Sequence, residues 1–459
     1  MMSSPLGSQS PTVEATARAP TTAEPHGKHA VAAPKRSAAA NDAVSERLAE
    51  APSEPQDDTS SDASALMQLP PGADPHIDWG LRAHLDADGN PRLVTRVLVV
   101  PAEFNGLRLD HFIKTQIPRL SRTRIQRVIA EVLTRADDGS ASATPPPAPS
   151  ATPPPALEVA LDGADRHGTI RSPLRPAMRV RTNEAFCITR PAQPEPPCPR
   201  FFSEVYADDD VIVIDKPAGL PVHASAKFYF NTLTRLLDET YGRGHQPCHR
   251  LDRETSGAMV IARHRRAASV IKQAFAAKGT RKLYLALVWG HPPWPQTLDA
   301  PGALLRYPLR NSEPGDATTV VGVRMVSDAR GLPSTTACHV IARSARFSLV
   351  QCQPITGRQH QIRVHCALAG YPLVGDKLYA HGDAAFKAFC DQGWSEARLA
   401  QFVLWRHGLH ALHIEFPHPA GGVRRVQAGL AKDIVALWQT DGGVLPPWVE
   451  ASQELPPTA

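Results

Sequence analysis

The larger, C-terminal part of the chain is predicted to be an α+β domain, because patterns typical of strands and of helices follow one another along it. Segments 203–206 and 211–214, with three aspartates between them, are typical of a β-hairpin. Apolar residues at helical spacing over 267–275 predict a helix that ends at Gly279. The segment 281–289 that follows is predicted to be a strand.

A second helix is expected over 357–369, and a late strand over 409–416. The chain has 459 residues, of which 42% are hydrophobic, so it is long enough for two or three domains with a sizeable core. We find no internal repeat and no glycine-rich phosphate loop in the sequence. The ordered part is expected to be shorter than the chain, because 45 prolines against 13 phenylalanines and 7 tyrosines indicate long segments that cannot bury surface.

Residues 1–75 are expected to form a disordered tail, because they are poor in aromatic residues and rich in alanine, serine, proline and mixed charge. They lack the apolar core of a signal peptide, and their acidic residues argue against an organellar transit sequence. No apolar run in the sequence approaches the length needed to span a bilayer. We therefore expect a soluble, cytoplasmic protein that has no membrane partner.

The 7 cysteines are scattered along the chain without a Cys-x-x-Cys pair, which is typical of reduced thiols in a cytosol. His245, Cys248 and His249 lie close together in the sequence, but no second pair of ligands follows at a usable spacing. His360 and His365 are five residues apart, so they do not share a helix face. We therefore expect no metal site.

A basic helix is predicted within segment 107–135, which carries seven lysines and arginines against two acids, a local net charge of +5. Ser121 is a candidate N-cap, and apolar residues recur at helical spacing over 125–132. Arginines in the first turn oppose the helix dipole unless an anion is nearby, and an RNA phosphate would supply one. The alternative is a solvated basic face. The candidate RNA-binding residues are Arg119, Arg122, Arg124 and Arg127.

The most informative stretch is His-Arg-Leu-Asp-Arg-Glu-Thr-Ser-Gly at 249–257. It places one carboxylate, Asp252, among cationic and hydroxyl neighbours at an expected junction of strand and turn, where we find no helix-capping role for it. The alternative is a charged surface turn, which Thr-Ser-Gly alone would suit. Asp252 is therefore the candidate catalytic residue.

A second long motif, Thr-Gly-Arg-Gln-His-Gln-Ile-Arg-Val-His, occupies 356–365 and is followed by Gly-Tyr-Pro-Leu-Val-Gly-Asp-Lys-Leu-Tyr at 370–379. Together with the motif around Asp252, it resembles the signature of the RluA-type pseudouridine synthases. Two shorter matches, Asp-Lys-Pro-Ala-Gly-Leu at 215–220 and Lys-Leu-Tyr-Leu-Ala-Leu-Val-Trp-Gly at 282–290, lie in the expected order. Each short motif is weak, but the ordered set is specific.

The resemblance covers 203–440 and implies a catalytic domain with a central, mostly antiparallel mixed sheet of the pseudouridine synthase type, flanking helices and an active cleft across the sheet. Pseudouridine formation breaks the C1′–N1 bond of a uridine, turns the uracil and joins C5 to the same sugar carbon. The resemblance implies that this needs no cofactor, and that Asp252 is the nucleophile or the general base. The residues do not decide between these two roles.

The resemblance also implies three substrate-binding residues. Arg363 is the expected salt-bridge partner of Asp252, because a carboxylate buried beside an unstacked base would gain a proton unless a cation held it ionised. Tyr284 is expected to stack on the target base, although a strand tyrosine is more often part of the core. Arg250 is expected to fill the gap left by the flipped nucleotide. Asp376 is a second candidate carboxylate that could equally be structural.

The basic helix resembles the start of an S4-type RNA-binding domain. This implies an S4-like module at 92–190, with a proline-rich insertion near 141–156 where the usual hairpin is missing. Segment 174–181 is where the module is expected to resume. The linker 191–202 then leads to the catalytic domain, and 441–459 are expected to form a C-terminal tail.

We therefore expect an RNA pseudouridine synthase that isomerises specific uridines in structured RNA and acts as a monomer. The S4-like module points to 23S-type rRNA, whereas segment 222–233 resembles a branch that includes transfer-RNA enzymes. The alternative is an RNA-binding or chaperone protein with the same fold and no essential catalysis. A nucleoside hydrolase that releases uracil is a third reading, but the sequence lacks a clear second acid/base carboxylate for it.

Overall fold

The computed structural model describes most of the chain from residue 67 onward. The described residues are 67–118, 120–126, 129, 174–225, 227–296, 301–320 and 322–450. The expected tail up to residue 66 and the proline-rich insertion lie outside the described residues, as do Arg119, Arg127 and residues 451–459.

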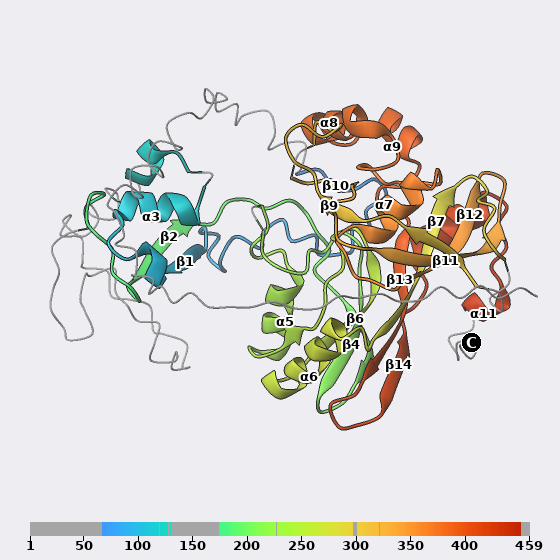
Figure 1. The fold of residues 1–459 in the computed structure, drawn as a ribbon, viewed down its shortest axis with the longest axis horizontal. Coiled ribbons are helices and arrows are strands. Elements are labelled where there is room, and N and C mark those ends of the chain that lie inside the picture. The colour runs from blue at the N-terminus through green and yellow to red at the C-terminus, as the bar shows by residue number, and fades with distance from the viewer. Residues whose placement is uncertain are drawn as a thin grey trace, which may run out of the picture. The chain divides into compact units, whose positions relative to one another are not determined.

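A mixed sheet forms the centre of the fold (Figure 1), and within the described residues it has ten strands. Eight of them run in the order β3-β4-β6-β13-β7-β12-β11-β8, while β5 pairs with β6 and β14 with β13. Only β6 and β13 pair in parallel among these strands. This confirms the expected mostly antiparallel α+β fold. The bounds are β3 Ser203–Ala207, β4 Val211–Lys216, β5 Gln246–Pro247, β6 Ser256–Ala262, β7 Arg281–Trp289, β8 Ala303–Arg306, β11 Thr335–Arg343, β12 Phe347–Pro354, β13 Leu409–Pro417 and β14 Val423–Gln427.

Helices cover both faces of this sheet, because its central strands are apolar on both sides. On one face, α5 (Leu233–Tyr241) packs on β4 and β6, and α7 (Gln361–Leu368) packs on β7, β11 and β12. On the other face, α6 (Arg265–Ala276) packs on β4 and β6, and α10 (Lys432–Thr440) packs on β7, β11 and β12. Within the described residues, helices on both faces therefore enclose the core.

Strand β7 illustrates how the alternation of side chains places a candidate residue. Leu285 and Leu287 point to the face covered by α10. Ala286 and Val288 point to the face covered by α7. Tyr284 lies on this second face, where it contacts both the α5 cluster and the α7 cluster.

The hairpin of β3 and β4, helix α6 and strands β7 and β13 confirm the elements expected from the sequence. Helix α7 begins only at Gln361, so the expected start at Gly357 is wrong. The reason is His360, whose φ of 53° is left-handed, so the right-handed helix cannot begin before Gln361. The side chain of Gln361 then ties the preceding turn in place, since it accepts bonds from Thr356 and from the Arg358 amide.

Several short elements were not expected from the sequence. Strands β9 (Leu309–Asn311) and β10 (Met325–Ser327) form a separate two-stranded sheet. Helices α8 (Gly382–Gln392) and α9 (Glu396–Phe402) follow α7 along the chain. Helix α11 (Pro447–Glu450) lies in the expected C-terminal tail, and its Val449 is buried in the α10 cluster.

A small module precedes the large sheet. Its strands β1 (Leu93–Val99) and β2 (Ala185–Pro191) pair antiparallel, and η2 (Ala102–Phe104) and α3 (Leu109–Gln116) follow β1. Residues before the undescribed stretch and residues after it pack together in one hydrophobic cluster. Residues of segment 174–181 contribute to this cluster. Ser121 accepts a bond from the Arg124 amide, as an N-cap does.

Two of the four candidate RNA-binding arginines lie in the described part of this module. Arg122 is exposed, and its Nε lies 3.8 Å from a carboxylate oxygen of the buried Asp110. Arg124 is exposed as well. Both guanidinium groups are therefore accessible to solvent.

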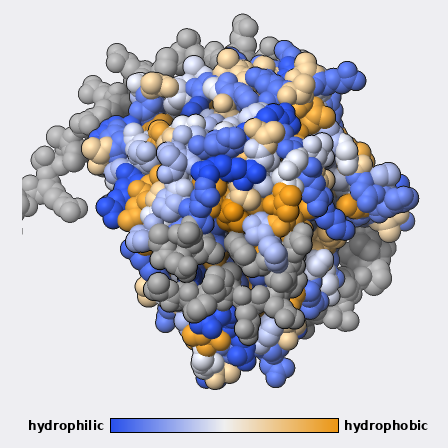
Figure 2. Space-filling model, turned by 90° about the vertical axis from the view of Figure 1, so that its right-hand side faces the viewer, coloured by the Kyte–Doolittle hydropathy of each residue, from blue (hydrophilic) through white to orange (hydrophobic). Residues whose placement is uncertain are grey.

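On the face drawn in Figure 2, hydrophobic residues form separate patches between hydrophilic ones. Six cysteines of the described residues are free thiols, and five of them are buried. No helix among the described residues is long and apolar enough to cross a membrane.

Candidate active site

Asp252 lies in a tight turn immediately before β6. The amide of Thr255 donates to the carbonyl of Asp252 at 3.1 Å, which closes the turn. Lys216 is fully buried behind it, and its Nζ donates to the carbonyls of Pro217, Leu220 and Arg253 at 2.8 to 3.2 Å. The short motif at 215–220 therefore supports the turn that carries Asp252.

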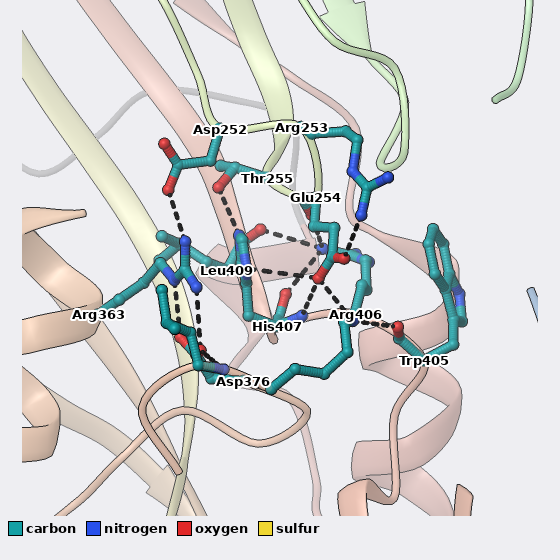
Figure 3. A network of polar contacts seen from close by, with 12 residues as sticks. Asp252, Arg253, Glu254, Thr255, Arg363, Asp376, Trp405, Arg406, His407 and Leu409 are labelled. Carbon is teal, nitrogen blue, oxygen red and sulfur yellow. Dashed lines mark hydrogen bonds and ion pairs between the residues drawn. The ribbon is translucent and has the colours of Figure 1, made fainter. Parts of the chain in front are cut away.

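Three other residues of the 249–257 motif, His249, Thr255 and Ser256, hold this turn to the sheet. His249 accepts a bond from the Val260 amide at 3.0 Å. Thr255 Oγ1 is bonded to His407 Nε2 at 2.7 Å, and Ser256 Oγ to His410 Nδ1 at 2.9 Å. These contacts fix the loop to β6 and to the start of β13, and Figure 3 shows the one between Thr255 and His407.

Asp252 forms an ion pair with Arg363 of α7, which is the contact expected from the sequence. Arg363 Nη1 lies 3.1 Å from Asp252 Oδ2. The same guanidinium donates to Asp376 through Nε at 2.7 Å and through Nη2 at 3.0 Å. Arg363 therefore lies between two carboxylates, as Figure 3 shows, with Asp376 on the buried side.

The charges of this triad stabilise one another in a buried setting. Burial would raise the pKa of Asp376, but Arg363 outweighs it and lowers that pKa to about 2. Burial would likewise lower the pKa of Arg363, but Asp376 and then Asp252 raise it above its usual range. Asp376 therefore keeps Arg363 charged and in place. The geometry supports the structural alternative left open for Asp376.

Tyr284 lies two strands away from the Asp252 turn, on the same side of the sheet. In the ladder, Ala411 of β13 is opposite Gly257 on one side and opposite Tyr284 on the other. Burial, and next the charge of Asp252, raises the pKa of the Tyr284 phenol. Its side chain is half-buried, so part of the ring remains exposed. The structure thus brings Asp252, Arg363 and Tyr284 together.

Arg250 is exposed. Its charge contributes to lowering the pKa of both His223 and His360. Since His360 lies beside Asp252, Arg250 is near the Asp252 site.

Sequence reasoning missed the network that lies behind the Asp252 turn. Glu254 accepts a bond from Lys377 Nζ at 2.8 Å, and Lys377 also donates to the Trp405 carbonyl. Arg406 is buried, forms a two-point ion pair with Asp433 and donates to the Glu254 carbonyl. The contacts of Glu254 with Lys377 and with Arg406 join segments far apart in the chain, so no local pattern indicates them.

Sequence reasoning also missed His360, which it considered only as a metal ligand. The ring of His360 lies next to the Asp252 carboxylate, with Nε2 3.8 Å from Oδ2. Its place three residues before Arg363 in the second long motif was the available signal. No group of three or more possible metal ligands is found among the residues that the structure describes.

Comparisons with known proteins find pseudouridine synthases among the similar chains. The family model described as RNA pseudouridylate synthase matches residues 210–368. Ribosomal large subunit pseudouridine synthase C of Salmonella typhi is 31% identical over 344 residues, which cover 74% of this chain and 94% of that protein. The mitochondrial tRNA pseudouridine(32) synthase of Saccharomyces cerevisiae is 36% identical over 191 residues, or 41% of this chain and 39% of that protein. The solved structure of human RNA pseudouridylate synthase domain containing 4 covers 52% of this chain and 92% of its own, with 25% identity and a TM-score of 0.39.

The fold and the matches define an isomerase that acts on RNA. The chain belongs to the RluA-type family of RNA pseudouridine synthases. This confirms the resemblance that the two long motifs indicated.

Proposed function

We propose that this protein converts specific uridines of structured RNA to pseudouridine with Asp252 as the catalytic carboxylate. The observation that carries the proposal is the ion pair between Asp252 and Arg363, held from behind by Asp376. A carboxylate with 20% of its side chain exposed can meet a nucleotide, and the guanidinium of Arg363 holds it in place. Asp252 then acts on the flipped nucleotide as nucleophile or base.

Tyr284 and Arg250 hold the target nucleotide in this proposal. The partly exposed ring of Tyr284 offers an aromatic surface on which a uracil stacks. The solvated guanidinium of Arg250 occupies the gap that the flipped nucleotide leaves in the RNA. Arg363 neutralises Asp252 without leaving the protein core, since only 9% of its side chain is exposed.

The test of Asp252 is its replacement by asparagine, which keeps the shape and removes the charge. We expect Asp252→Asn to abolish pseudouridine formation on RNA while RNA affinity stays within a few-fold of wild type. Asp209→Asn is the matched control, because Asp209 is an exposed aspartate of the hairpin turn between β3 and β4. Product formation by Asp252→Asn at the wild-type rate contradicts the assignment.

The favoured substrate is ribosomal RNA of the large subunit. Support comes from the relatives: the Salmonella typhi enzyme matches over 74% of this chain, whereas the yeast transfer-RNA enzyme matches over 41%. Mapping pseudouridines in ribosomal and transfer RNA from cells that lack the protein tests this choice. Loss of a site in 23S-type rRNA supports it, and loss confined to transfer RNA contradicts it.

The small module at 92–190 is proposed to be an S4-like RNA-binding domain that contributes affinity through its arginines. The exposed Arg122 and Arg124 support this proposal. Phosphate contacts make binding fall steeply with salt, so RNA affinity that is indifferent to ionic strength contradicts it. We further propose that the enzyme acts as a monomer in the cytoplasm, a state that sedimentation of the purified protein with and without RNA tests.

A further inference from the structure

His360 stands beside Asp252 in a backbone conformation that side chains rarely adopt. Its φ is 53°, in the left-handed region, and 13% of its side chain is exposed. Such strained residues gather at functional sites, where the rest of the fold holds them in place. The ring nitrogen Nε2 faces Asp252 Oδ2, the same oxygen that Arg363 contacts.

The contacts of Tyr379 are the basis for assigning the proton of the His360 ring. The amide of Met325, on β10, donates to the Tyr379 hydroxyl at 2.9 Å. That hydroxyl lies 2.9 Å from His360 Nδ1 and has one proton to donate. We assign this proton to the bond with Nδ1, which places the ring proton on Nε2, the nitrogen that faces Asp252.

The surrounding charges keep this imidazole neutral. Burial, and next the charge of Arg363, lowers the pKa of His360 to about 4. Arg250 acts in the same direction, whereas Asp252 and Asp376 act against it. At neutral pH the ring thus presents an N–H donor without a full positive charge, so it does not compete with Arg363 for Asp252.

We propose that His360 is a positioning residue that holds Asp252 Oδ2 together with Arg363 and so leaves Oδ1 as the reacting oxygen. Oδ1 has no hydrogen-bond partner among the described residues, whereas Oδ2 has Arg363 at 3.1 Å and His360 at 3.8 Å. The longer contact closes when uridine fills the site, since catalytic hydrogen bonds tighten in the substrate complex. The inference rests on the proposed role of Asp252.

Three variants distinguish the effect of losing the N–H donor of His360 from the effect of changing the backbone conformation at residue 360. His360→Asn keeps a residue type that tolerates the left-handed region but is too short to reach Oδ2. We expect its kcat to fall roughly 10- to 100-fold, the size of a lost hydrogen bond to a charged group, with RNA affinity unchanged. His360→Gln restores an N–H donor at the reach of Nε2, and we expect it to recover part of the loss. Tyr379→Phe removes the ring's anchor, and we expect a smaller fall in kcat.

The pH profile of kcat supplies a readout that a merely structural role does not move. Because His360 faces Oδ2 of the reacting carboxylate, its replacement moves the acid limb of the profile in His360→Asn, and by less in Tyr379→Phe. The other charged or titratable groups near Asp252 and His360 are unchanged in both variants, namely Arg363, Asp376, Arg250, Lys216 and Tyr284.

The outcomes distinguish this inference from the function on which it rests. An active wild type, an inactive Asp252→Asn and a shifted acid limb in His360→Asn support both. A His360→Asn enzyme with wild-type kcat and an unmoved acid limb overturns the role of His360 and leaves that of Asp252 intact. If His360→Asn does not fold, Tyr379→Phe decides by the same criterion. Activity in Asp252→Asn overturns both.

Discussion

Arg363 and Asp376 form a two-point ion pair in the core, and this pair leaves one guanidinium nitrogen, Nη1, directed at Asp252. A planar guanidinium bound at two points has a fixed orientation. The direction of Nη1 is therefore set by Asp376 before any substrate arrives. We therefore expect Asp376 to act as a positioning residue, through Arg363.

Asp376→Asn tests this arrangement. The amide can accept only one of the two bonds and carries no charge, so Arg363 loses its orientation and its buried counter-ion. We expect kcat to fall roughly 10- to 100-fold and stability to fall by about 3 kcal/mol, as for a buried pair that loses one partner. Single-turnover kinetics and urea unfolding measure the two effects. Wild-type kcat in a folded Asp376→Asn protein contradicts the positioning role.

Gly257 is expected to tolerate no side chain. Its φ is 111°, and a Cβ there would lie 2.2 Å from the carbonyl oxygen of Ala411. Gly244 is the matched control, since its φ is 118° but a Cβ there would meet no atom within 4 Å. We expect Gly244→Ala to cost about 1–2 kcal/mol for the backbone conformation alone, and Gly257→Ala to cost clearly more, as measured by thermal unfolding. Equal losses would show that the close approach of β6 and β13 is not limiting.

Acid should destabilise the protein through Glu254. Burial raises its pKa, but Lys377 and then Arg253 outweigh burial and lower it from 4.5 to about 2. A group whose pKa is lower in the folded state stabilises the fold above its unfolded pKa, and this contribution is lost as pH falls towards the folded value. The depression corresponds to about 3 kcal/mol, lost between about pH 5 and pH 2.

Glu254→Gln removes this titration. We expect the variant to be less stable than wild type at pH 7, because Lys377 loses its counter-ion. Its stability should nevertheless fall less steeply in acid, and urea unfolding at a series of pH values measures both slopes. Parallel slopes for wild type and Glu254→Gln would count against the assignment.

Two substitutions of Tyr284 separate the contribution of its ring to RNA binding from that of its hydroxyl. Stacking of a base on an aromatic ring is worth about 1–3 kcal/mol. We expect Tyr284→Leu to weaken binding of a short target RNA roughly 5- to 150-fold. Tyr284→Phe keeps the ring and should bind within a few-fold of wild type, so any fall in its kcat reports on the hydroxyl. Titration of a fluorescent RNA supplies the affinities, and equal affinities of the two variants are incompatible with stacking.

The long apolar elements could be predicted from the sequence, because β4, α6, β7 and β13 carry enough buried residues to show their periodicity. Strands β9 and β10 have three residues each, too few to show a period. The start of α7 was misplaced because a left-handed histidine has no local signature.

The features of the candidate site also divide into those that could be predicted from the sequence and those that could not. Asp252, Tyr284 and Arg363 stand in motifs that can be read along the chain. The partnership of Glu254 with Lys377 spans 123 residues, and that of Arg406 with Glu254 spans 152, so only the folded sheet reveals them. His360 was visible in the motif, but its role depends on Tyr379 and Met325, which come from other segments.

The insertion of β13 between β6 and β7 has a consequence for synthesis of the protein. Ala411 separates the strand that follows Asp252 from the strand that carries Tyr284, and it is translated more than a hundred residues after either of them. The sheet between the Asp252 turn and Tyr284 therefore cannot close before β13 has been synthesised. We expect a chain truncated before β13 to lack the assembled site.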